Sequence, residues 1–153
     1  MATSDKLNLT CLASTSRRAS RAVTNFFNAR MKPLDLNVAQ FGLLIAINNA
    51  PGQSLATISE AMLIDESTMA RNLGVLERRG LVESEGGRGR GGKQVNLTPD
   101  GKALYTSGIR IWKQANAALE NAMKAEQVAA GRLFMRGLTE AAERLRIEDE
   151  SET

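Results

Sequence analysis

Apolar side chains recur every three or four positions along most of this chain, which is the spacing of one face of an α-helix. The first such segment covers residues 7–31, and Pro33 predicts its end because the residue before a proline disfavours the helical region. A second segment begins after Asn37 and reaches residue 49, and a third, short one follows Ser54. Asn and Ser are good helix N-caps, so the pattern predicts three helices here. The apolar stripe of the second helix is Val38, Phe41, Leu44 and Ile45.

The stretch 65–79 predicts a fourth helix, with Asp65 as its N-cap and Gly80 as its stop. One side of this helix is apolar and is expected to face the core: Met69, Leu73 and Leu76. Only a tight connection at residues 63–64 separates it from the third helix. Two short helices joined in this way are typical of a helix-turn-helix.

The other side of the fourth helix carries short hydroxyls, a guanidinium, an amide and a small apolar group: Ser67, Thr68, Arg71, Asn72 and Val75. Such groups suit the base edges and phosphates of a DNA major groove. The alternative is an ordinary solvated helix face. The neighbouring segments favour the DNA-reading interpretation.

Residues 81–85 and 93–97 read as two strands with alternating apolar positions. Five of the seven residues between them are glycine, which excludes a helix and suits a hairpin tip. A hairpin after a helix-turn-helix predicts a wing. Its cations, Arg88, Arg90 and Lys93, are candidates for phosphate or minor-groove contacts, and a solubilising loop is the alternative.

The rest of the chain predicts two long helices, at 99–124 and 126–146, followed by an acidic tail at 147–153. A small winged-helix core at 34–98 cannot cover these helices and the helix at 7–31 as well. Apolar helices left over at both ends argue for burial against a second copy. We therefore expect one mainly α domain with a small β-hairpin wing, its winged helix-turn-helix core flanked by N- and C-terminal dimerisation helices.

Composition narrows the function further. The chain has 153 residues, no histidine and one cysteine, so we expect no zinc site, no cofactor and no histidine-based catalysis. The net charge of +3 is modest, but basic residues gather in 1–32 and 67–93, where they could attract phosphates. The absence of histidine also favours a protein that is not an enzyme. No apolar run is long enough to cross a bilayer and no signal peptide is evident, which favours a cytoplasmic protein.

With these features the chain resembles the multiple-antibiotic-resistance regulator (MarR) family of bacterial transcription factors. The resemblance spans nearly the whole chain, and its motifs occur in a specific order and spacing: Leu34–Phe41, Leu55–Met62, Asp65–Arg71, Leu76–Val82 and Val95–Gly101. It implies a homodimer whose terminal helices form the interface and whose two recognition helices enter successive major grooves. It also implies a ligand pocket between the dimerisation helices and the winged helix, as many members of the family have.

Two further sites are candidates on this basis. Large apolar residues that could line an effector pocket are Phe27, Met31, Phe41 and Trp112, although such residues at helical spacing are first of all core. Some relatives sense hydroperoxides through a cysteine near the start of the first helix, and Cys11 lies in that neighbourhood. A lone cysteine on a helix is more often a small apolar filler.

The wing departs from the family pattern. Members usually carry an Asp-x-Arg there, and the matching positions in this chain are Gly89 and Gly91, on either side of Arg90. We therefore expect a looser wing with less sequence-selective contacts.

The sequence thus predicts a homodimeric repressor that binds a pseudo-palindromic site in double-stranded DNA. A small-molecule effector or thiol oxidation would release it by changing the separation of the two recognition helices. The alternative is a winged-helix protein-interaction module without sequence-specific DNA binding.

Overall fold

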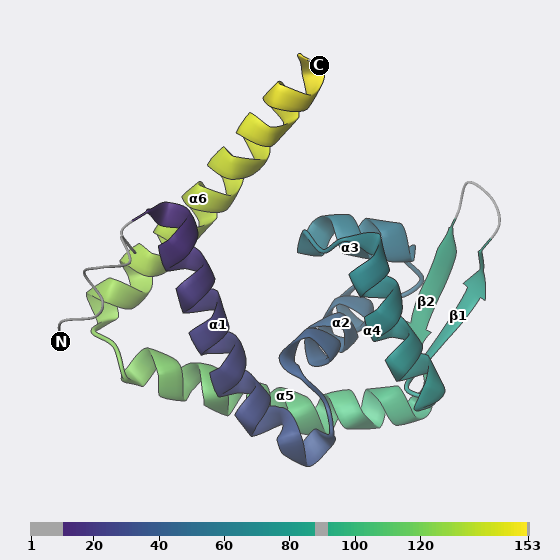
Figure 1. The fold of residues 1–153 in the computed structure, drawn as a ribbon. Coiled ribbons are helices and arrows are strands. Elements are labelled where there is room, and N and C mark those ends of the chain that lie inside the picture. The colour runs from purple at the N-terminus through teal and green to yellow at the C-terminus, as the bar shows by residue number, and fades with distance from the viewer. Residues whose placement is uncertain (1–10, 88–91, 153) are drawn as a thin grey trace. The chain divides into compact units, whose positions relative to one another are not determined.

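The structure, a computed structural model, describes residues 11–87 and 92–152 (Figure 1). In chain order its elements are α1 (Leu12–Met31), the 3-10 helix η2 (Lys32–Leu34), α2 (Val38–Asn49), α3 (Leu55–Met62), α4 (Glu66–Arg78), β1 (Val82–Gly86), β2 (Lys93–Leu97), α5 (Pro99–Asn121) and α6 (Ala125–Ser151). The mainly helical fold with one antiparallel hairpin confirms the predicted class. By contacts the chain divides into two units, 1–112 and 113–153.

The predicted end of α1 at Met31 is confirmed, but the backbone of the next residue is not as expected. Lys32 keeps helical backbone angles (φ −48°, ψ −42°), although it precedes Pro33, and the chain continues into η2. Proline is tolerated there because the first positions of a helical turn need no N–H donor. Asp35, with a left-handed φ of 51°, ends this turn and leads the chain to α2. At its other end α1 begins after Cys11, so the predicted start at residue 7 lies outside the described residues.

Helix α2 lies at the centre of the first unit. The predicted cap is confirmed: Asn37 Oδ1 accepts from the backbone N–H of Gln40, whose side chain accepts from the backbone N–H of Asn37. Its predicted stripe was too narrow, because Leu43 and Ile47 are also buried, whereas Val38 and Ile45 are only partly so. The reason is that α1, α4 and β2 all pack on this helix, so it is covered on several sides.

The helix-turn-helix forms as predicted. Ser54 caps α3 by accepting from the Thr57 backbone N–H, and Asp65 caps α4. Between them Leu63 adopts a left-handed φ of 52° that reverses the chain. Gly80 follows α4 with a φ of 68°, a conformation that favours glycine and explains why the helix stops there.

The wing strands pair antiparallel, with Val82 opposite Leu97 and Gly86 opposite Lys93. The first strand is shifted by one residue from the predicted 81–85, since Leu81 is buried but lies outside the ladder. Ser54 forms an isolated bridge with Gln94, so the connection between α2 and α3 also pairs with β2. The half of β2 nearer the wing tip is therefore held by the N-terminus of α3.

Helix α5 begins as predicted, with the Thr98 hydroxyl accepting from the Gly101 backbone N–H. A Cβ at Gly101 would lie 1.9 Å from the Leu81 carbonyl oxygen, so only glycine permits this close approach between α5 and the end of the helix-turn-helix. Trp112, on the same helix, is the last residue of the first unit.

In the second unit, α6 runs to Ser151, so the prediction that the helix ends at 146 is wrong. Arg146 explains the extension, because its guanidinium pairs with Glu143 and Glu150 one turn away on either side. These carboxylates, Glu143 first, raise the pKa of Arg146 above its ordinary value. None of the described helices is long and apolar enough to cross a membrane.

Candidate nucleic-acid interface

The N-terminal end of α4 is organised by the Asp65 carboxylate. Its Oδ1 accepts from the Ser67 hydroxyl at 2.6 Å and from the Thr68 backbone N–H at 2.8 Å. These bonds, the one from Ser67 first, lower the pKa of Asp65 to about 2. The carboxylate is therefore ionised throughout the physiological range, where it complements the positive end of the helix dipole.

The two faces of α4 separate as predicted. Met69, Leu73 and Leu76 are buried against the first unit. On the other side Ser67 and Arg71 are exposed, while Thr68, Asn72 and Val75 are partly exposed. Among the residues in 11–87 and 92–152, no carboxylate forms an ion pair with Arg71, so its guanidinium can meet a phosphate or a base.

The C-terminal end of α4 is tied to the wing by Glu77. Its Oε1 lies 2.9 Å from Lys93 Nζ on β2 and also accepts from the Ser84 hydroxyl on β1. Partial burial raises the pKa of Glu77, but the hydrogen bonds from Ser84 and Lys93 outweigh it, and the pKa lies below its usual value. Lys93, predicted as a DNA contact, thus has an intramolecular partner that holds both strands of the wing to the recognition helix.

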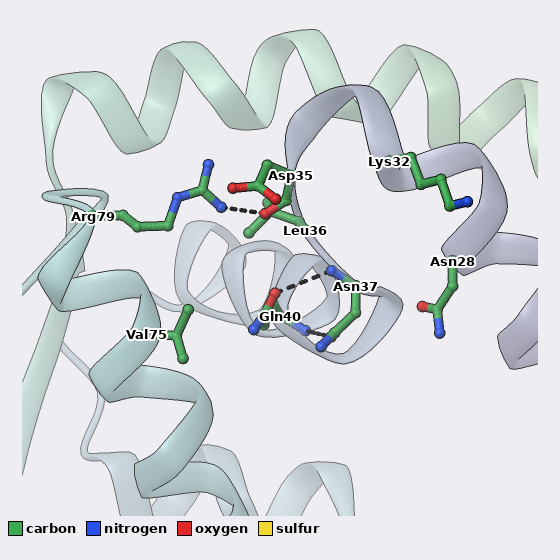
Figure 2. A pocket seen from close by; sticks show the side chains of 8 residues that line it. All are labelled: Asn28, Lys32, Asp35, Leu36, Asn37, Gln40, Val75 and Arg79. Atoms are coloured by element: carbon green, nitrogen blue, oxygen red, sulfur yellow. Dashed lines mark hydrogen bonds between the residues drawn. The ribbon is translucent and has the colours of Figure 1, made fainter.

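Arg79, the C-cap of α4, was not singled out from the sequence. Its guanidinium donates to the backbone carbonyl oxygen of Asp35 at 2.5 Å (Figure 2). It also donates to the backbone carbonyl oxygen of Leu34 at 3.1 Å. These acceptors lie in the connector between α1 and α2, 44 and 45 residues earlier in the chain. No local sequence pattern predicts a contact between residues so far apart in the chain. Arg79 therefore links the recognition helix directly to the connector between α1 and α2.

The wing tip carries two other predicted cations, Arg88 and Arg90, together with Gly89 and Gly91. These four residues lie outside the described residues. Their DNA contacts, and the looseness expected from the missing Asp-x-Arg, stay predictions. The described part of the wing ends at Gly87 and resumes at Gly92.

The four candidate effector-pocket residues come together. The ring of Trp112 lies 4.7 Å from that of Phe27 and 5.6 Å from that of Phe41, between ring centroids. Phe27, Phe41 and Met31 are buried. A Cβ at Gly108 would clash with the Phe41 ring, so α5 packs closely on this aromatic cluster. Burial of this kind favours a core role.

Cys11 is exposed and serves as the N-cap of α1. Its Sγ accepts from the Ser14 backbone N–H at 3.3 Å and lies 3.0 Å from the Ser14 hydroxyl oxygen. These bonds, the side-chain one first, lower the pKa of the Cys11 thiol. One hydroxyl group, that of Ser14, therefore lies beside the Cys11 thiol.

Comparisons with known proteins agree with this geometry. A family model described as MarR family matches residues 34–91, which cover the helix-turn-helix and most of the wing. The transcriptional regulator MosR of M. tuberculosis is 26% identical, with 88% of this chain and 96% of that chain covered and a TM-score of 0.76. MosR solved in complex with DNA is likewise 26% identical, with 89% and 98% covered and a TM-score of 0.77.

A solved structure with lower sequence identity to this chain has the same fold. BpsR of Bordetella bronchiseptica, whose DNA binding is regulated by 6-hydroxynicotinic acid, is 23% identical, with 87% of this chain and 96% of that chain covered and a TM-score of 0.78. The comparison with curated proteins gave no match.

A helix-turn-helix followed by an anchored hairpin defines a winged helix-turn-helix protein, a class that places its second helix in the DNA major groove. Residues 34–91 of this chain are similar to the MarR family, and the transcriptional regulator MosR shares the fold of most of the chain.

Proposed function

We propose that this protein is a homodimeric repressor that binds a pseudo-palindromic operator and releases it in response to a small molecule. The proposal rests on how α4 is held and on which of its side chains are exposed. Its apolar face is buried, its C-terminal end is tied to the wing by Glu77, and its N-terminal half leaves Ser67 and Arg71 exposed. A helix held in this way can present side chains to a groove without rearranging first.

The proposed base- and phosphate-reading side chains on α4 are Ser67, Thr68, Arg71, Asn72 and Val75. Arg71 is the principal specificity residue, because an arginine can bind O6 and N7 of a guanine together. The Ser67 hydroxyl donates to Asp65, so in that state Ser67 offers the groove an acceptor. Arg88 and Arg90 supply the wing contacts, with Lys93 mainly holding the wing in place through Glu77.

Dimerisation is supported by apolar surface that a single chain leaves uncovered. No side chain of α6 is buried, and Leu133 and Phe134 remain 72% and 56% exposed. On α1, Leu12 and Val23 are also exposed. A second copy could cover these residues, and closed two-fold pairing is the commonest way to do so. In this proposal 34–98 is the DNA-binding core, while the helices before and after it form the dimer.

Release by an effector follows from the same architecture, because two half-sites are bound together only at one separation of the recognition helices. BpsR, regulated by 6-hydroxynicotinic acid, gives a precedent for a small organic acid in this fold. The aromatic cluster of Phe27, Met31, Phe41 and Trp112 stays a predicted effector pocket, and Cys11 a predicted oxidation site. A regulator of this kind acts beside the chromosome, so we place it in the cytoplasm and assign it no catalytic role.

Selection of genomic fragments by the purified protein tests the proposal. We expect enrichment of fragments that share a two-fold symmetric motif, with half-sites about one helical turn apart. Recovery of fragments without a common motif, together with binding that does not change with salt, would favour an interaction module instead.

A further inference from the structure

A cavity of about 310 Å³ lies at the base of the wing, between the end of α2, the two strands and the first turn of α5. All of its lining residues belong to the first unit. None of them comes from α1, the connector or α4, and none belongs to the aromatic cluster of the predicted effector pocket. The volume suits a small ligand, because ligand sites range upwards from about 300 Å³.

Backbone hydrogen bonds fix the walls of this cavity. After α2 the chain pairs with β2, since Gly52 N–H donates to the Val95 carbonyl and Val95 N–H donates to the Gln53 carbonyl, each at 3.2 Å. The start of α5 is joined to the end of the helix-turn-helix, because Thr98 N–H donates to the Leu81 carbonyl at 3.1 Å. The cavity is therefore formed before a ligand arrives, as ligand sites usually are.

Two opposite charges line the cavity. Glu83 lies on the exposed face of β1, directly opposite Asn96 of β2, and Lys102 lies in the first turn of α5. Within 11–87 and 92–152, neither Glu83 nor Lys102 forms an ion pair, with each other or with any other residue. Both charges are therefore available to a ligand.

A ligand with a single charge does not suit this pair. An anion that binds Lys102 is repelled by the Glu83 carboxylate, and a cation that binds Glu83 is repelled by the Lys102 ammonium. A ligand that carries both charges a short distance apart pairs with both residues at once. The last turn of α2 has no basic residue, so the negative end of its dipole adds to the attraction for an ammonium group.

The rest of the lining is made of two amides and an apolar wall. Asn48 and Asn96 can each donate to a carboxylate or accept from an ammonium, and neither side chain has a hydrogen-bond partner among the described residues. The apolar wall is Ile47, Pro51 and Leu97. We propose that this cavity binds a free α-amino acid with a short aliphatic side chain. Its ammonium lies on Glu83, its carboxylate on Lys102 and its side chain on the apolar wall.

The bound amino acid connects three elements at the base of the wing. Glu83 belongs to β1, Asn96 to β2 and Lys102 to α5, so a ligand that contacts all three holds both strands to α5. We therefore expect amide hydrogen exchange in β1 and β2 to slow when the ligand is bound. Binding at this cavity does not depend on the proposed repressor function, and it is measured without DNA.

The probes are L-leucine and two analogues that each lack one charge, titrated by calorimetry into the full chain. L-Leucinamide keeps the ammonium and loses the carboxylate, whereas 4-methylpentanoate keeps the carboxylate and loses the ammonium. The diagnostic variants are Glu83→Gln and Lys102→Gln, both at exposed positions where the fold should be preserved. Their matched controls are Glu85→Gln, on the same face of β1, and Lys113→Gln, at another exposed lysine of α5.

We expect L-leucine to bind the wild type saturably, and each analogue to bind it about three- to fivefold more weakly, since each lacks one charged contact at an exposed site. Lys102→Gln should weaken leucine by a similar factor and bind leucinamide at least as tightly as the wild type does. Glu83→Gln should do the same for leucine and 4-methylpentanoate. These pairings of residue and ligand charge form a double-mutant cycle, which separates each contact from the net charge.

Absence of saturable leucine binding overturns the proposal, and so does equal affinity of the wild type for the three compounds. Losses in Glu85→Gln or Lys113→Gln as large as those in the diagnostic variants would show an effect of net charge, which also overturns it. In amide NMR spectra, leucine should shift the side-chain NH₂ signals of Asn48 and Asn96 and leave that of Asn28 in place. The reverse pattern would put leucine elsewhere. Unchanged exchange in β1 and β2 with leucine bound would contradict the link to the wing.

Discussion

The two ends of the recognition helix are held in different ways. At the N-terminal end the bonds are local, from Asp65 to residues within the first turn, and Ser67 and Arg71 stay exposed. At the C-terminal end the bonds are long-range, from Glu77 to both wing strands and from Arg79 to the connector. The difference separates two tasks along one helix, since the first end is free to read DNA and the second sets where the helix points.

Between the two ends, the buried row of Met69, Leu73 and Leu76 supports both. Leu73→Ala should therefore have the largest effect, lowering the free energy of unfolding by about 2–5 kcal/mol. Leu73 is 1% exposed, so the deleted atoms leave a cavity. Urea denaturation measures the loss, and Val75→Ala on the opposite, partly exposed face should cost much less. Equal losses for the two variants would contradict the assignment of faces.

Arg71→Ala tests the reading end. It should weaken operator binding by about 1–3 kcal/mol while leaving stability unchanged, because Arg71 is exposed and has a base or phosphate as its partner only in the complex. Arg110→Ala, which removes an exposed arginine from α5, controls for the loss of charge. Titration of operator and random duplexes compares them. Similar losses in both variants would mean that Arg71 contributes only general charge.

Glu77→Gln tests the positioning end. The ion pair with Lys93 is partly exposed, so we expect a loss of stability below about 1 kcal/mol. Hydrogen exchange in β1 and β2 should nevertheless accelerate. Because the pKa of Glu77 is lowered, its stabilisation is complete above the ordinary glutamate pKa and is lost as the pH falls through the lowered value. Unchanged exchange in β1 and β2 would show that Glu77 does not hold the wing.

The smallest effect concerns the cap. Asp65→Asn keeps a side-chain acceptor for the Thr68 N–H but removes the charge. The pKa of Asp65 falls from 3.8 to about 2 on folding, so its charge stabilises the native state above pH 3.8 and ceases to do so as the pH drops towards 2. Melting temperatures of wild type and variant should converge over that range. Curves that stay parallel would argue against the charged cap.

The features that the sequence predicted correctly depend on residues that lie close together in the chain. The caps at Asn37, Ser54 and Asp65, the glycine stop at Gly80 and the apolar face of α4 all follow from bonds or periodicity within one helical turn. Each of these features depends on only a few nearby residues, so local sequence is enough to locate the buried and exposed faces of α4.

What the sequence missed depends on tertiary partners. The role of Arg79 requires knowing that the connector, 44 residues earlier, packs beside it. Lys93 looked like a free wing cation because nothing local indicates that Glu77 lies opposite. The additional burial of Leu43 and Ile47 arises from several elements packed on α2, which periodicity along one helix cannot express.

The central claim is that the N-terminal half of α4 reads the operator base by base. The most direct test is to measure binding of wild type and Arg71→Ala to operators that each carry one symmetric base-pair change. The account predicts that Arg71→Ala loses its preference at one position of each half-site and retains the preferences at all others. Preferences retained at every position, or reduced equally at all of them, would contradict it.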